Sequence, residues 1–219
     1  MLGLGSKQLF QLYDRLAECG LSVAAVDPFR GKPWPTDTFP PKPGAVQEHG
    51  HERWLHDGEL GGGLDAARPA LTDGLALLHG QGAMRVCCVG VGHGAELAIN
   101  AGQVDHMFIA VGAVNPTGGT HAHFAEAACK VKVPLGLVYA RGEFEPHHTQ
   151  SELSKRPFGK LCVFRQVGGD RMPPGFCTAA ASWGDHVAAA VAGQAAGALA
   201  DFLITAYQLS SELASRRSE

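Results

Sequence analysis

The chain has 219 residues, of which 45% are hydrophobic and 18% charged, and its formal net charge is -3. This length and composition predict a single globular domain spanning residues 1–219. The weak net charge and the lack of a Lys/Arg-rich stripe argue against a nucleic-acid partner. No apolar run approaches the roughly 18 residues that a membrane span requires, and no signal peptide is visible, so we expect no membrane partner.

The first elements alternate between helix and strand. Ser6 can cap a helix that Gly20 ends, and Leu9, Leu12, Tyr13 and Leu16 form one face of it. Residues 21–26 read as a buried strand. Residues 28–64 form a long loop with six prolines, in which Trp34, Phe39 and Trp54 could anchor a partner. We expect this loop to act as a lid, followed by a helix over about residues 65–80.

The second half predicts an α/β fold. Apolar, β-branched runs at residues 85–92, 106–113, 133–140 and 160–167 are typical of a mostly parallel sheet covered by helices on both faces. A last helix over residues 186–209 should direct five side chains toward the core: Val187, Val191, Leu199, Phe202 and Leu203. Residues 210–219 are expected to form a frayed tail.

Residues 86–98, VCCVGVGHGAELA, carry the most informative pattern. An apolar strand enters a glycine-rich turn and leaves as a helix, which is the layout of a nucleophile elbow, G-x-nucleophile-x-G. Gly90 and Gly94 are the flanking glycines, and His93 follows the tip. The tip itself is Gly92, which has no side chain. The pattern therefore predicts the frame of a hydrolase site without its reactive atom.

Four further segments resemble motifs of one protein family and occur along the chain in the same order as in that family. Residues 15–31, residues 115–117 (Asn-Pro-Thr), residues 142–146 (Gly-Glu-Phe-Glu-Pro) and residues 174–176 (Pro-Gly-Phe) resemble motifs of the dienelactone hydrolase family, as does the elbow. The resemblance covers residues 3 to about 207. It implies an α/β-hydrolase fold, and it implies that strands preceding residue 6 are missing, including one that lies beside the elbow strand.

The family's chemistry uses a Cys or Ser nucleophile, a His base and an Asp that orients the base. Carried over by resemblance, these positions fall on Gly92, Pro174 and Glu145. A glycine cannot form an acyl-enzyme and a proline cannot carry a proton, so only the acid is kept. The resemblance thus implies a degenerate member without a catalytic triad.

Other residues offer weaker sites. Cys88, four residues before the elbow tip, reads as a core thiol, and His186 beside Asp185 reads as the start of the last helix. The histidine pairs 49/51, 121/123 and 147/148 read as exposed loop residues, so we expect no metal. The glycines 90, 92 and 94 lack the rest of a nucleotide-binding motif, so we expect no cofactor.

Six scattered cysteines without C-x-x-C spacing indicate reduced thiols, and hence a cytoplasmic or other reducing intracellular compartment. Two functions stay open at this point. The first is a catalytically inactive binding or structural subunit of a larger assembly, which would contact protein partners through loop 28–64 or the sheet margin near residues 1–5. The second is a hydrolase of small esters or lactones. The alternative to a larger assembly is a monomer with a mobile loop.

Overall fold

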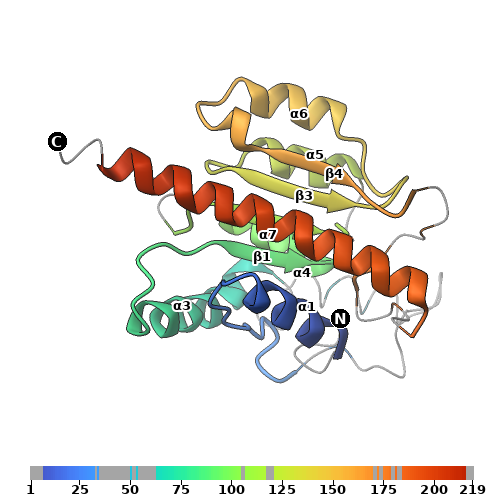
Figure 1. The fold of residues 1–219 in the computed structure, drawn as a ribbon, viewed down its shortest axis with the longest axis horizontal. Helices are drawn as coiled ribbons and strands as arrows, with labels where there is room; N and C mark the ends of the chain where they lie inside the picture. Colours follow the sequence, from blue (N-terminus) through green and yellow to red (C-terminus); the bar gives the residue numbers. More distant parts are fainter. Residues whose placement is uncertain are drawn as a thin grey trace.

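The computed structural model describes residues 7–32, 34, 50, 53, 63–104, 107–116, 121–169, 172, 175–178, 181 and 184–215. Within them four parallel strands form one sheet in the order β1-β2-β3-β4: β1 (Cys88–Val91), β2 (Val111–Val114), β3 (Leu135–Tyr139) and β4 (Val163–Gln166). The predicted parallel α/β sheet is therefore confirmed, with strands shorter than the apolar runs that announced them. Figure 1 shows the sheet with β1 and β3 as arrows that point the same way.

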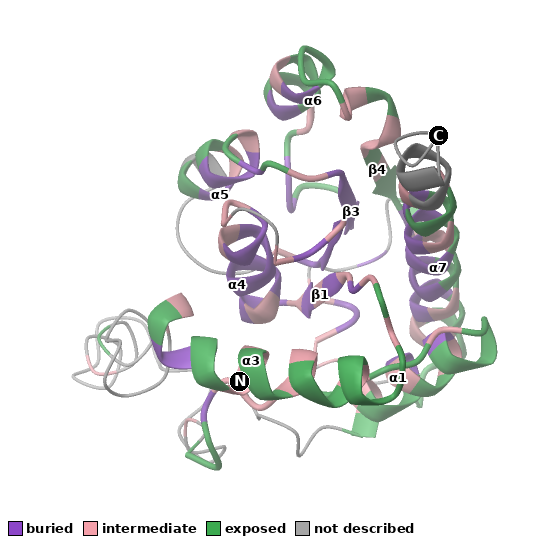
Figure 2. Cartoon of the chain, turned by 90° about the vertical axis from the view of Figure 1, so that its left-hand side faces the viewer, coloured by how far each residue is buried: buried purple, intermediate pink, exposed green. Residues whose placement is uncertain are grey.

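Helices lie on both faces of this sheet (Figure 2). On one face α7 (His186–Ser215) crosses β2 and β3, and α1 (Lys7–Glu18) packs on α7. On the other face α4 (His93–Ala101) covers β1 and β2, and its neighbours are α3 (Leu64–Gly80) and α5 (His121–Cys129). Next to α5 lies α6 (His147–Ser154), which is followed by the short helix η3 (Gly159–Leu161).

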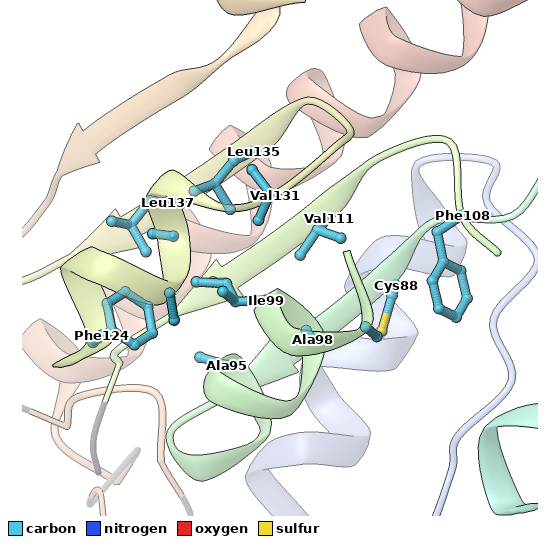
Figure 3. Close-up of a cluster of buried hydrophobic side chains, with 14 of the residues drawn as sticks. Cys88, Ala95, Ala98, Ile99, Phe108, Val111, Phe124, Val131, Leu135 and Leu137 are labelled. Carbon is cyan, nitrogen blue, oxygen red and sulfur yellow. The ribbon is translucent and has the colours of Figure 1, made fainter. Parts of the chain in front are cut away.

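The two faces carry separate apolar cores. Under α4, the small side chains of Ala95 and Ala98 let the helix approach the strands closely, and Ile99 reaches between Val111 and Leu135 (Figure 3). On the other face, α7 lies so close to the strands that a Cβ at Gly136 would overlap the ring of Phe202. Close packing of this kind fixes both helices relative to the strand ends, where the candidate site lies.

Helix α7 explains why one long apolar segment fits a folded core. By length and composition, residues 186–210 could cross a membrane, which the sequence alone did not suggest. The helix nevertheless has a buried side against the sheet and an exposed side that includes Gln194, Asp201, Thr205 and Gln208. A polar stripe opposite an apolar one is typical of a helix that packs on a sheet.

Several expectations about the elements need correction. Residues 21–27 are extended but pair with no strand within the described residues, so the strand predicted at 21–26 is wrong there. Val187 is 60% exposed rather than directed to the core. Helix α7 continues to Ser215, into the tail predicted at 210–219. Residues 121–123, predicted as a loop, begin α5.

The other helices agree with their predicted positions. Gly20 follows α1 with a φ of 87°, and the face of α1 that holds Leu12 and Leu16 is buried. Helix α3 begins one residue before the predicted start, and His186 begins α7 as expected. Most of loop 28–64, with Phe39 and Trp54, lies outside the described residues, as do residues 1–6.

Candidate functional site

The candidate site lies at the carboxyl ends of the parallel strands. Val91, Val114 and Val138 stand in register on β1, β2 and β3, so the loops that follow them begin side by side. Backbone bonds extend this register, because Gly92 N donates to Val114 O and Asn115 N donates to Val138 O, both at 2.9 Å. In open α/β sheets this edge is where ligands and reactants bind.

The elbow at the end of β1 forms as the sequence predicts. β1 ends at Val91, α4 begins at His93, and Gly92 alone makes the turn with φ 61° and ψ -123°. Side chains rarely adopt this backbone conformation, because positive φ brings a Cβ against the neighbouring carbonyl. The tip of the elbow therefore has the strained geometry of a nucleophile position and presents only backbone.

The two flanking glycines have different physical roles. A Cβ at Gly90 would overlap the carbonyl group of Gly94, since the start of α4 folds back onto the end of β1. A Cβ at Gly94 would meet no atom within 4 Å. Gly90 is thus required by the close approach of two backbone segments, whereas Gly94 is not required by its surroundings.

His93 is buried directly after the tip, beside Phe29 and Glu96. Its ring stacks on Phe29 with a centroid distance of 6.4 Å. Its Nδ1 lies 3.8 Å from Oε2 of the buried Glu96, whose Oε1 lies 3.8 Å from Nε2 of His123. The elbow therefore carries a histidine and a carboxylate. Neither Phe29 nor Glu96 is a serine, threonine or cysteine.

A buried polar network joins the loops after β2, β3 and β4. Glu143 and Asn115 are both buried, and the Asn115 side-chain amide donates to Oε1 and Oε2 of Glu143 at 2.8 and 2.7 Å. The carboxylate also accepts from Ala140 N at 2.6 Å and from Gly175 N. Cys177 N donates to Asn115 Oδ1 at 2.7 Å. Two side chains thus accept hydrogen bonds from three backbone N–H groups, in the loops after β3 and β4.

The structure describes two of the three predicted triad positions, Gly92 and Glu145. Gly92 is at the elbow tip, whereas the Glu145 side chain is 80% exposed and lies 3.5 Å from Nε2 of His147. Pro174 lies outside the described residues. The carboxylate that faces the neighbouring loops is Glu143, two residues before the expected acid. The sequence analysis missed Glu143 and Asn115, although both lie inside the motifs that it quoted.

Five of the six cysteines lack the surroundings of a reactive thiol, and the sixth, Cys19, is exposed directly after α1. All six are free thiols. Burial raises the pKa of Cys87, Cys88 and Cys177 to about 12, and the charge of Glu143 adds to this effect at Cys177. Burial also raises the pKa of Cys129 and Cys162. A reactive cysteine needs the opposite shift, because the thiolate is the nucleophile. Cys88 is the core thiol that the sequence predicts.

The histidine pairs do not assemble a metal centre in the part of the chain that the structure describes, where no group of three metal-ligating side chains is found. His147 and His148 are exposed at the start of α6. His49 and His51 lie outside the described residues, as does the side chain of His121. His186 starts α7, and its neighbour Asp185 accepts a hydrogen bond from Val187 N at 2.7 Å, which is the role of a helix cap.

Comparisons with protein-family models, with curated protein sequences and with solved structures give no match. The established result is thus a parallel α/β sheet with helices, and an elbow at the end of its first strand.

The elbow gives a first prediction. Gly90→Ala should lower the free energy of unfolding by about 3 kcal/mol or more, because backbone cannot move aside as a flexible side chain can. Gly94→Ala is the matched control. It should be neutral or stabilising by up to about 1 kcal/mol, because alanine favours a helix over glycine. Urea denaturation of the two variants measures both. Equal losses would show that the close contact between β1 and α4 does not exist.

The polar network gives a second prediction. Glu143→Gln replaces one carboxylate oxygen, which only accepts hydrogen bonds, with an amide NH2 group, which donates them. Because the carboxylate accepts four hydrogen bonds, this change should lower the free energy of unfolding by about 3 kcal/mol. Glu145→Gln, two residues away and exposed, should change it by less than about 0.5 kcal/mol. Denaturation midpoints compare the pair. A larger loss of unfolding free energy for Glu145→Gln than for Glu143→Gln would show that Glu145, and not Glu143, is the buried carboxylate.

Proposed function

We propose that this chain is a degenerate relative of the dienelactone hydrolases that has no catalytic activity of its own and serves as a binding or structural subunit of a larger assembly. One observation carries the proposal. The elbow keeps its backbone geometry at Gly92, with φ 61°, while the atom that would attack a carbonyl is missing. A fold can persist without its chemistry, because activity resides in the site and not in the fold.

The acid and base positions support the same conclusion. In a hydrolase, a buried acid orients the histidine that activates the nucleophile. Here the aligned acid Glu145 is in solvent with His147, and the aligned base is Pro174. The loop at Gly175 is instead tied to the buried Glu143. The loops are thus held by hydrogen bonds to backbone groups, which need no titratable base.

A hydrolase of small esters or lactones is the competing function. It would require a nucleophile beside His93, since a histidine without one performs no acyl transfer. The thiols nearest the elbow in sequence are Cys87 and Cys88, and both stay protonated at neutral pH because their pKa is about 12. This chemistry favours the non-catalytic proposal.

The partners we propose are proteins, and the compartment is cytoplasmic or otherwise reducing. Six free thiols in one chain support a reducing environment, where cysteines stay unpaired. Protein partners are supported by the sequence of loop 28–64, because aromatic residues such as Trp34, Phe39 and Trp54 are enriched at the centres of protein interfaces.

A third prediction tests the lack of activity. The purified chain should hydrolyse p-nitrophenyl acetate and dienelactone no faster than the chain unfolded in urea does at matched concentration, corrected for the effect of urea on the background rate. Gly92→Cys should raise this rate little, because an added thiol has no paired base to activate it. Steady-state absorbance assays at pH 7.5 measure all of these rates.

Gly94→Cys serves as the matched control, because it adds a thiol two residues after the elbow tip, at a position where a Cβ meets no neighbouring atom. Equal, low rates for both cysteine variants agree with the proposal. Turnover by the unmodified chain that is lost on unfolding would contradict it.

A further inference from the structure

We draw no further inference here: the strongest candidate, the cluster of His93, Glu96 and His123 where α4 meets α5, belongs to the site already described, and its two contacts of 3.8 Å do not define which ligand it would take.

Discussion

The close approach of β1 and α4 determines most of what this chain can do. The carbonyl of Gly94 occupies the space of a Cβ at Gly90, and Gly92 completes the reversal with a backbone conformation that side chains seldom adopt. Such a turn is costly for any residue except glycine. In a hydrolase that cost is tolerated because the tip holds the nucleophile. Gly92 adopts it at little cost and brings no side chain, so the turn serves as a joint between strand and helix.

The loops around this joint are held by hydrogen bonds in place of a catalytic relay. Glu143 and Asn115 are buried together, and between them they bond to the backbone of residues 140, 175 and 177. A buried carboxylate is stable when donors surround it, and four donors do so here. This arrangement fixes the carboxyl-end loops without any group that must gain or lose a proton. It agrees with the proposed non-catalytic role.

The sequence predicts the parts of this structure that depend on local pattern. Apolar runs located the four strands, and the glycines at 90, 92 and 94 located the elbow, because spacing and backbone freedom are local properties. Predictions from the sequence were wrong where the structure depends on contacts between segments that are far apart in the chain. Residues 21–26 have a strand pattern but no ladder, since pairing needs a second strand. Glu143 rather than Glu145 is buried, because its partner Asn115 lies 28 residues earlier in the sequence, in another loop. Val187 is exposed because the first turn of α7 extends beyond the core, and the buried side chains of this helix begin at Val191.

The central claim is that the elbow tip offers no nucleophile, and covalent labelling tests it most directly. The folded chain is incubated with a fluorophosphonate and, separately, with a β-lactone, reagents that acylate or phosphonylate activated serine, threonine and cysteine. Intact mass is then compared with that of the chain treated after unfolding. The account predicts no adduct that depends on the folded state. One adduct per chain, formed only when the chain is folded and mapped to a single residue beside His93, would contradict it.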